Sequence, residues 1–275
     1  MASIRQELAE HGLFAKKRLG QHFLVDRNIL SKVVQTAEIR KEDVILEIGP
    51  GLGEMTLALA RSARRVIAVE IDAALAEILR KKLADLPNVE VVKSDILKVD
   101  FKSLFEEERR PVKVVANLPY QISTPLLFRF IESKEFFSTL TLMLQKEVAA
   151  RMAAPPGGKE YGPLSIFVQV YLDASVRFSI KPSAFFPAPK VDSAVVHMVW
   201  KGNPRVESQD EEWFKKVVKA SFGYRRKTLV NALKHSELPL PDSIESKMEA
   251  AEIDPRRRPE TLTMEEFIRL AAALK

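Results

Sequence analysis

Short apolar runs alternate with helical patterns between residues 44 and 144, and this alternation limits the possible folds more than any other feature. Short β-branched runs joined by helices form βαβ units, so the pattern predicts a parallel sheet. The carboxyl ends of parallel strands share one edge, where α/β proteins bind their ligands. The predicted strands are Val44–Ile48, Arg65–Val69, Val89–Val92, Val112–Ala116 and Leu140–Leu144, with helices at Leu52–Ala63 and Ala73–Leu83.

The pattern changes near residue 202. Val168–Leu172 and Ala194–Trp200 are predicted to be late strands that form an antiparallel hairpin at the sheet edge. Only helical periodicities follow the break at Gly202-Asn203-Pro204. We therefore expect an α/β domain over residues 1–201 and a small all-helical domain over residues 202–275. Its expected helices are Glu211–Ser221, Arg225–Lys234, Ser243–Ala251 and Met264–Leu274.

Composition narrows the class of protein. The 275 residues are 46% hydrophobic and 29% charged, which suits a folded, soluble chain. No signal peptide and no apolar stretch of membrane-spanning length is present, and cysteine is absent, so a cytoplasmic protein is expected. The lack of cysteine excludes disulfides, thiolate zinc sites and a thiolate nucleophile. The four histidines are scattered, so no metal site is expected.

Positive charge gathers in three places. The formal charge is +6, and the basic clusters are Lys16–Arg18, Trp213–His235 and Arg256–Arg258. The middle cluster holds seven Lys or Arg residues and no acidic residue. Clusters of this kind suggest a polyanionic partner, although a solvated basic surface explains any one of them equally well.

A glycine-rich turn, Glu47-Ile-Gly-Pro-Gly-Leu-Gly53, lies between a predicted strand and a predicted helix. Glycines let a backbone approach a ligand closely, and the helix presents its N-terminus to that ligand. The spacing Gly-x-Gly-x-Gly differs from the dinucleotide pattern, and Pro50 removes one amide donor. Both points favour a nucleoside without a pyrophosphate over a dinucleotide. A simple tight turn is the alternative.

Two acidic residues end the next two strands. Glu70 can accept both hydroxyl protons of a ribose, and Asp95 can bind the exocyclic amine of an adenine. Either residue alone could equally be a surface or capping residue. The glycine turn and the two acids on successive strand ends together favour a nucleoside site.

Asn117-Leu118-Pro119-Tyr120 ends the fourth strand and carries the chemical hypothesis. The Asn117 amide oxygen and the Leu118 carbonyl could accept both N–H groups of an aromatic amine, which would expose the nitrogen lone pair. Pro119 restrains that carbonyl, and Tyr120 offers a ring on which a base can stack. This pattern indicates amine methylation without a metal, although a plain β-turn uses the same residue types. The lack of cysteine argues against 5-methylation of cytosine.

Over nearly its whole length, the chain resembles the bacterial small-subunit rRNA adenine dimethyltransferases (the KsgA/RsmA family). This family also includes eukaryotic enzymes and, more distantly, the Erm resistance methyltransferases. The matching segments are Lys17–Leu24, Glu47–Gly53, Val69–Asp72, Ser94–Asp95, Asn117–Tyr120, Ile122–Pro125, Leu144–Val148, Phe185–Val196 and Arg225–Leu229. The resemblance implies a Rossmann-like class I methyltransferase sheet followed by a small all-helical C-terminal domain. It also implies S-adenosylmethionine as cofactor.

The implied reaction is dimethylation of N6 in two adjacent adenosines of the hairpin loop near the 3′ end of 16S rRNA, in an assembling 30S subunit. We expect a monomer whose residues 1–20 are mobile without cofactor. The expected cofactor residues are His22, Leu24, Gly49, Gly51, Glu70, Asp95 and Asn117, where His22 replaces a frequent Asn. The expected catalytic residues are Asn117, Leu118, Pro119, Tyr120 and Phe185, whose ring would face Tyr120 across the base. The expected RNA-binding residues are Lys16, Lys17, Arg18, Arg225, Arg226 and Lys227.

Three other functions stay open. An adenine-N6 DNA methyltransferase shares the chemistry, but those enzymes more often carry Asp or Asn-Pro-Pro-Tyr. An Erm-type enzyme would act on large-subunit rRNA, yet Phe185–Val196 and the helical tail fit the small-subunit branch better. A ribosome-assembly factor with little catalysis, or a transcription factor on the same fold, would not require the intact acids and the intact motif at Asn117–Tyr120.

Overall fold

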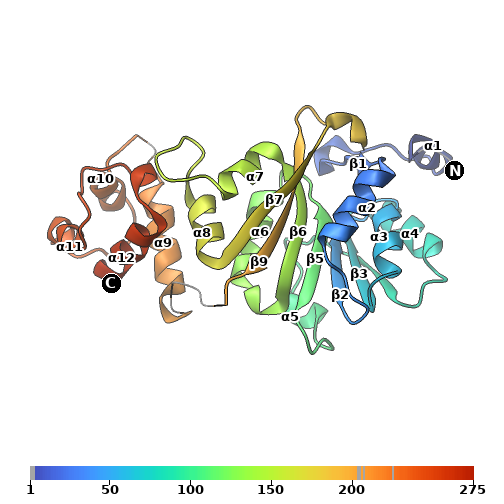
Figure 1. Ribbon diagram of the computed structural model, residues 1–275, viewed down its shortest axis with the longest axis horizontal. Coiled ribbons are helices and arrows are strands. Elements are labelled where there is room, and N and C mark those ends of the chain that lie inside the picture. Colours follow the sequence, from blue (N-terminus) through green and yellow to red (C-terminus); the bar gives the residue numbers. More distant parts are fainter. Residues whose placement is uncertain (1–3, 203–205, 207, 225) are drawn as a thin grey trace. The chain divides into compact units, whose positions relative to one another are not determined.

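A seven-stranded sheet with the order β4-β3-β2-β5-β6-β9-β7 organises the first part of the chain (Figure 1). The structure is a computed structural model that describes residues 4–202, 206, 208–224 and 226–275. A separate two-stranded sheet pairs β1 with β8. The strands are β1 (Phe23–Leu24), β2 (Val44–Ile48), β3 (Arg65–Glu70), β4 (Val89–Lys93), β5 (Val112–Asn117), β6 (Phe137–Gln145), β7 (Leu172–Ile180), β8 (Phe185–Phe186) and β9 (Ser193–Trp200).

The register of the parallel strands gathers the sequence motifs at one edge. β2 pairs in parallel with β3 and β5, β3 with β4, and β5 with β6, which confirms the predicted parallel sheet. Ile48 lies opposite Val69 on one side and Ala116 on the other. The residues that follow these three positions, Gly49, Glu70 and Asn117, therefore share the carboxyl edge.

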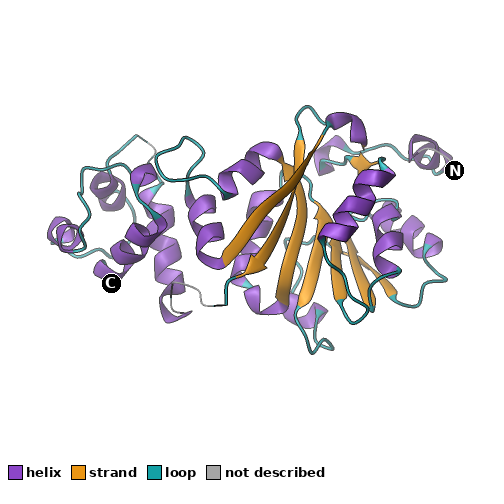
Figure 2. Ribbon diagram, in the orientation of Figure 1, coloured by secondary structure: helices purple, strands orange, loops and turns teal. Residues whose placement is uncertain are grey.

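Both faces of this sheet are covered by helices (Figure 2). On one face, Val33 of α2 and Leu59 of α3 pack in a core cluster with Ile45 and Val115, and α4 packs beside them on β3. On the other face, α5 and α6 meet the start of β6 through aromatic rings. The helices are α1 (Ile4–Glu10), α2 (Arg27–Thr36), α3 (Glu54–Ala60), α4 (Ala73–Lys82), α5 (Phe101–Leu104), α6 (Ser123–Glu132), α7 (Lys146–Met152), α8 (Pro163–Tyr171), α9 (Glu211–Ser221), α10 (Leu229–Lys234), α11 (Ile244–Ala250) and α12 (Met264–Ala273).

The predicted strand at Val168–Leu172 is wrong. Val168 to Tyr171 form the end of helix α8, and strand β7 begins only at Leu172. Nearly every residue of α8 is buried, so the helix lacks the polar face that would have shown its period. Pro163 at its first turn is the helix signal that the β-branched run obscured. The edge strand β7 lies beside β9, which pairs antiparallel with β6.

The chain divides into two compact units. The first contains residues 1–149 and 175–200, and the second contains residues 150–174 and 201–275. The second unit resumes at residue 201, so the expected boundary after residue 201 is one residue too late. The inclusion of residues 150–174 in that unit was not anticipated. It follows from α8, since the Phe167 ring packs edge-on against Phe214 of α9 with ring centroids 6.0 Å apart.

Strand β7 begins at residues 172–174 of the second unit, and the rest of its described part contains only helices and turns. The all-helical expectation for residues 202–275 agrees with this over the residues described. Helices α9, α11 and α12 begin and end within one residue of the expected bounds. Helix α10 begins at Leu229 and not at Arg225, which lies outside the described residues. Among the helices that the structure describes, none has both the length and the apolar character needed to cross a membrane.

Candidate active site

The glycine-rich turn between β2 and α3 is built on left-handed backbone. Gly49, Gly51 and Gly53 have φ values of 66°, 59° and 85°, which L-residues with a Cβ rarely adopt. A Cβ on Gly51 would lie 2.9 Å from the Phe23 ring, while a Cβ on Gly49 would meet nothing closer than the Asn117 backbone oxygen at 4.0 Å. All three glycines are thus needed for the backbone conformation, and Gly51 also for its packing on Phe23, whereas Gly49 leaves an open backbone surface at the sheet edge.

Glu70 ends β3 with a buried and firmly held carboxylate. The Gly51 N–H donates to its Oε2 at 3.3 Å, and the Asp72 N–H donates to its Oε1 at 2.8 Å. Burial raises the pKa of this carboxyl group, and the two amide donors partly offset the rise. A carboxylate fixed in this way at a strand end is suited to receive the two hydroxyls of a ribose.

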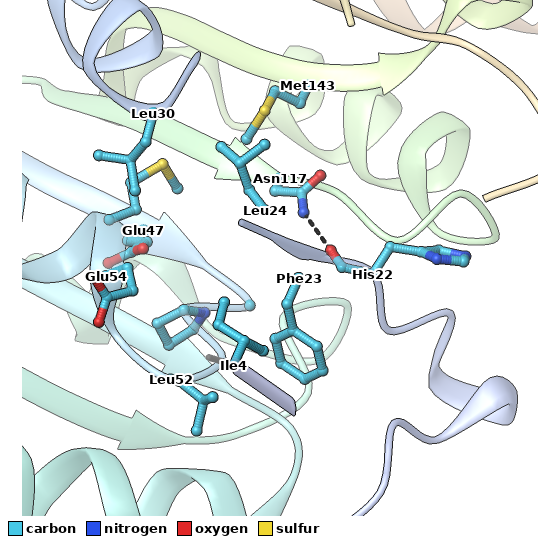
Figure 3. A pocket seen from close by; sticks show the side chains of 13 residues that line it. Ile4, His22, Phe23, Leu24, Leu30, Glu47, Leu52, Glu54, Asn117 and Met143 are labelled. Atoms are coloured by element: carbon cyan, nitrogen blue, oxygen red, sulfur yellow. Dashed lines mark hydrogen bonds between the residues drawn. The ribbon is translucent and has the colours of Figure 1, made fainter. Parts of the chain in front are cut away.

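Two adjoining cavities lie at this edge of the sheet, and both are lined by His22, Phe23, Gly49 and Asn117. The first, shown in Figure 3, also includes Glu47 and residues from α1 to α3. The second includes Glu70 and the motif after β5. Its remaining lining residues are Leu19, Gly20, Gln21, Gly51, Ile71, Leu75, Leu118, Pro119 and Tyr120. Most of the expected cofactor and catalytic residues thus border one connected region.

Glu47 is a functional candidate that the sequence pattern marked only as the first residue of the glycine turn. Its side chain is fully buried, and neither carboxyl oxygen accepts a hydrogen bond from any residue that the structure describes. Burial raises the pKa of Glu47 to about 8, although the nearby Thr56 hydroxyl offsets part of the rise. The signal for it was present, because Glu47 is the one charged residue in the otherwise apolar strand Val44–Ile48. A buried carboxyl group that lines a cavity without a protein partner is a candidate ligand-binding group.

The Asn117–Tyr120 motif leaves two acceptors open side by side in the chain. The Asn117 Nδ2 donates to the His22 carbonyl at 2.8 Å, so its Oδ1 is oriented as the remaining acceptor. Neither that Oδ1 nor the Leu118 carbonyl accepts a hydrogen bond within the described part of the chain. The next two carbonyls are occupied, Pro119 by the Ile122 N–H and Tyr120 by the Ser123 hydroxyl. This arrangement leaves two acceptors for an amine.

Tyr120 is fixed in place beside His22. Its hydroxyl shares a 2.9 Å hydrogen bond with the Ser193 hydroxyl. The His22 ring stacks on it, with ring centroids 5.6 Å apart and planes inclined at 28°. The His22 Nδ1 lies 2.6 Å from the Pro187 carbonyl oxygen. The departure from the frequent Asn at this position therefore adds an aromatic ring next to the predicted stacking residue.

The structure places Phe185 in the core beside the β1–β8 pair, and its expected position opposite Tyr120 stays a prediction. Phe185 is 5% exposed, pairs with Leu24 across the β1–β8 sheet and belongs to the core of the first unit. It lines neither of the two cavities, and the ring that stacks on Tyr120 in the structure is that of His22. Two adjacent phenylalanines alternate across a strand, and the sequence alone could not show which of them faces the core.

Asp95 lines neither of the two cavities. Its Oδ1 accepts the Leu97 N–H at 3.0 Å, so it caps the turn after β4. The Ser94 N–H donates to the Glu70 carbonyl at 3.0 Å, which keeps this turn next to the end of β3. The adenine-binding role of Asp95 stays a prediction.

The N-terminal segment is held against the site by more contacts than its sequence suggested. Leu8 is 3% exposed and packs with Phe23, Leu52 and Leu75. The Lys82 ammonium group donates to Glu7 and to the Leu52 carbonyl, each at 2.8 Å. The expectation that residues 1–20 are mobile without cofactor rested on their few apolar anchors, of which Leu8 is one, and it stays a prediction.

The expected RNA-binding residues of the first unit differ in how free they are. The Lys16 ammonium group forms an ion pair with Asp72 at 2.6 Å, and the Asp72 side chain is 3% exposed. Lys17 and Arg18 are exposed and form no ion pair with any residue in the described part of the chain. Lys17 and Arg18 are therefore the better candidates for phosphate contacts.

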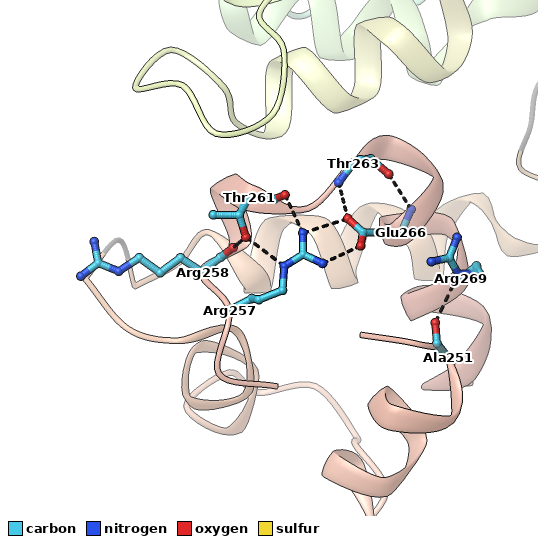
Figure 4. A network of polar contacts seen from close by, with 7 residues as sticks. All are labelled: Ala251, Arg257, Arg258, Thr261, Thr263, Glu266 and Arg269. Carbon is cyan, nitrogen blue, oxygen red and sulfur yellow. Dashed lines mark hydrogen bonds and ion pairs between the residues drawn. The ribbon is translucent and has the colours of Figure 1, made fainter. Parts of the chain in front are cut away.

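The second unit shows the same contrast between free and occupied cations. Arg226 is exposed, whereas the Lys227 ammonium group lies 2.6 Å from the His235 Nε2. Arg225 lies outside the described residues. In the third basic cluster, Arg257 binds both carboxylate oxygens of Glu266, at 2.5 and 3.0 Å (Figure 4). Arg257 thus stabilises the fold around α12 and is not a free phosphate contact.

Comparison with known families decides what kind of protein this is. The family model described as ribosomal RNA adenine dimethylase matches residues 12–275. The chain belongs to this family. Ribosomal RNA small subunit methyltransferase A of Geobacter metallireducens is 46% identical over 265 residues, which are 96% of each chain. The protein of the same name from Lactococcus lactis is 49% identical over 275 residues, 97% of this chain and 92% of that one.

Solved structures agree with the family assignment. A dimethyladenosine transferase from Plasmodium falciparum superposes with a TM-score of 0.76 at 28% identity and covers 90% of this chain and 96% of that one. The 23S rRNA methyltransferase ErmE superposes with a TM-score of 0.68 at 27% identity, over 92% of this chain and 99% of that one. The expected Rossmann-like class I methyltransferase fold is confirmed.

The protein is therefore an rRNA adenine dimethyltransferase, and S-adenosylmethionine is its methyl donor. The residues at the sheet edge fit this donor. The Glu70 carboxylate is held by two backbone N–H groups at the end of β3, the backbone at Gly49 is open, and Glu47 offers a buried carboxyl group at the cavity. Pro50 has no amide proton and so cannot donate to a pyrophosphate in this turn.

Proposed function

We propose that this enzyme dimethylates N6 of two adjacent adenosines in the 3′-terminal hairpin loop of 16S rRNA. We propose further that it acts as a monomer in the cytoplasm, on the 30S subunit during assembly. The observation that carries the chemistry is the pair of open acceptors, Asn117 Oδ1 and the Leu118 carbonyl, beside a restrained Tyr120 ring. The small-subunit branch is favoured because relatives that are 44–49% identical over nearly the whole chain are named for that subunit.

The cofactor end of the site follows from the strand ends. S-adenosylmethionine supplies, when bound, a methyl group on a positively charged sulfur. Glu70 would accept hydrogen bonds from the ribose hydroxyls, and Asp95 would accept one from the amine of the cofactor's adenine. The backbone of Gly49 and Gly51 would border the donor, with His22 and Leu24 closing over it. These roles require no metal ion, since the donor already carries the leaving-group charge.

The target end of the site is formed by the Asn117–Tyr120 motif. Asn117 Oδ1 and the Leu118 carbonyl would accept the two N–H groups of the target amine and turn its lone pair towards the donor. Tyr120 would stack on the base, and Pro119 would hold the Leu118 carbonyl in place. The nitrogen becomes acidic as it is methylated, so its proton can leave to water afterwards. Alignment of this kind supplies much of the rate of a methyl transfer.

The base must leave its stack to reach this region, and a hairpin loop makes that step less costly than a duplex does. Exposed cations on both units, including Lys17, Arg18 and Arg226, would contact phosphates. The loop of an assembling subunit would then be recognised by position and shape more than by base sequence.

The test is methyl transfer from labelled S-adenosylmethionine to 30S subunits isolated from a strain that lacks this modification. Parallel reactions contain 50S subunits, mature 30S subunits and adenine-containing duplex DNA. We expect label only on the unmodified 30S particle, and primer extension should stop at two adjacent adenosines near the 3′ end. Label on 50S subunits or on DNA in place of 30S subunits would keep the chemistry and overturn the proposed substrate.

A further inference from the structure

Phe14 is the most exposed large apolar side chain among the residues that the structure describes. It is 82% exposed, whereas the other exposed apolar side chains, Val176 among them, reach at most 49%. A solitary exposed Val needs no explanation, but an aromatic ring that is almost wholly in water leaves nearly its entire apolar surface unpaired. Such a ring is more informative when the backbone that carries it is fixed.

The backbone around Phe14 is fixed on both sides. Helix α1 is followed by Gly12, whose left-handed φ of 63° allows the Leu13 N–H to donate to the Leu8 carbonyl at 2.8 Å. Leu13 and Ala15 both pack on the cluster that contains Leu8. With both neighbours anchored in this cluster, the Phe14 side chain is left in the solvent.

The same short segment carries two free cations and leads directly into the site. Lys17 and Arg18 are exposed and have no ion-pair partner within the described chain, whereas Lys16 is paired with Asp72. The residues immediately after them, beginning with Leu19, line the cavity that contains Tyr120. An exposed aromatic ring and two unpaired cations thus lie, in the sequence, just before the residues that line the cavity with Tyr120.

We propose that Phe14 is a stacking platform for an unpaired base of the RNA substrate, outside the target region, while Lys17 and Arg18 contact the adjoining phosphates. The proposal rests on the proposed function, in which the substrate is an RNA loop. Aromatic rings flanked by cations bind single strands in this way, since every base has a face that can stack. Hairpin loops supply such unstacked bases beside the flipped adenosine. The positive charge of the segment favours a nucleic acid over an apolar protein surface.

The first experiment compares the steady-state kinetics of Phe14→Ala, Phe14→Leu and Phe14→Trp on 30S subunits from a strain lacking the modification. Removal of one base–aromatic stack should raise the KM for the particle by roughly 5- to 150-fold in the Ala variant. The Leu variant should show the same rise in KM, because it has no aromatic face although it keeps apolar area. The Trp variant should have a KM close to that of the wild type. S-adenosylmethionine affinity, measured by calorimetry, should be unchanged in all three. Val176→Ala, at another exposed apolar site, is the matched control.

A direct readout uses the fluorescence of the Phe14→Trp variant with oligoadenylate as the probe. Stacking should quench the added tryptophan, and the wild type gives the background from Trp200 and Trp213. A KM unchanged in Phe14→Ala, a Leu variant as good as wild type, or a parallel fall in cofactor affinity would each overturn the proposal. A wild-type protein that methylates no RNA would instead refute the proposed function. In that case the fluorescence of Phe14→Trp with oligoadenylate would still show whether a base stacks at position 14.

Discussion

The two glutamates of the candidate site show how differently one fold can treat the same side chain. Glu70 is buried and receives two backbone N–H donors, which offset part of the cost of burying its charge. Glu47 is buried more completely and receives none from the described residues. Ionising Glu47 therefore costs free energy that the nearby Thr56 hydroxyl recovers only in part, and the pKa of Glu47 rises to about 8.

A pH-dependent stability follows for Glu47→Gln. The folded-state pKa of about 8 lies above the ordinary value of 4.5, so the contribution of Glu47 is complete below pH 4.5 and is lost as the pH rises towards 8. Glutamine stays neutral and has no such loss. The variant should thus gain on the wild type between about pH 5 and pH 8, by at most about 1.4 kcal/mol per pH unit. Thermal unfolding without cofactor measures this, and a stability difference that is constant over that range would contradict it.

Asn117→Ala should separate binding from catalysis. The variant lacks the Oδ1 acceptor and also the donor that holds the His22 carbonyl. If positioned polar groups act here as they do in other sites, kcat should fall about 100-fold or more. Affinity for 30S subunits, measured by sedimentation, should stay within about twofold, since phosphate contacts supply most of it. Full activity in the variant would exclude the proposed role of the motif, and an inactive wild type with intact binding would favour an assembly factor.

At the scale of elements, helix α1 is held in place at only a few points. Leu8 is its one buried residue, and the pairing of Phe23 with Phe186 fixes the far end of the segment. A helix of this length is not stable alone, so it depends on those contacts. The few apolar residues of this segment are visible in the sequence, but their convergence on Leu52 and Leu75 is not.

Leu8→Ala should free this segment. Truncation of a buried leucine removes most of the apolar contact that orders α1, at a cost of roughly 2–5 kcal/mol if the site cannot collapse. Hydrogen exchange of residues 4–22 should become faster in the variant, while exchange in β2 and β5 stays unchanged. Val191→Ala, at an exposed position, is the control. Equal exchange in Leu8→Ala and wild type would mean that the segment is already open without cofactor.

The elements that could be predicted from the sequence are those with a local pattern. Such patterns mark the five parallel strands, the glycine turn and the polar residues at three strand ends. The structure pairs those five strands in parallel, as predicted. Helix α8 and the orientation of Phe185 could not be predicted, because both depend on what surrounds them. A segment buried on all sides has no period to read, and two equal neighbours on a strand do not reveal which one faces inwards.

At the scale of the whole molecule, the net charge of +6 is less informative than how the cations are paired. Lys16 and Arg257 are bound to Asp72 and Glu266, so they serve the fold. Lys17 and Arg18 have no such partner among the residues described. A basic cluster in sequence is therefore a mixture of structural and free charges, which only the packed molecule distinguishes.

The salt dependence of 30S binding should reveal this difference. Removing one cation that binds a phosphate should reduce the slope of log K against log salt by nearly one. We expect such a reduction for Lys17→Ala and a smaller one for Lys16→Ala, whose charge is already neutralised by Asp72. Filter binding or sedimentation between low and physiological salt gives both slopes. Equal reductions would show that the Lys16–Asp72 ion pair opens when RNA binds.

The proposed reaction has one diagnostic product, so analysis of the nucleosides after reaction is the decisive measurement. RNA from unmodified 30S subunits, incubated with enzyme and S-adenosylmethionine, is digested and separated by liquid chromatography with mass detection. We predict N6,N6-dimethyladenosine as the final product, with N6-methyladenosine appearing first and then declining, and two dimethylated residues per particle. A product that stops at the monomethyl stage, or a methyl group on any atom other than adenine N6, would contradict the roles proposed for Asn117, Leu118 and Tyr120.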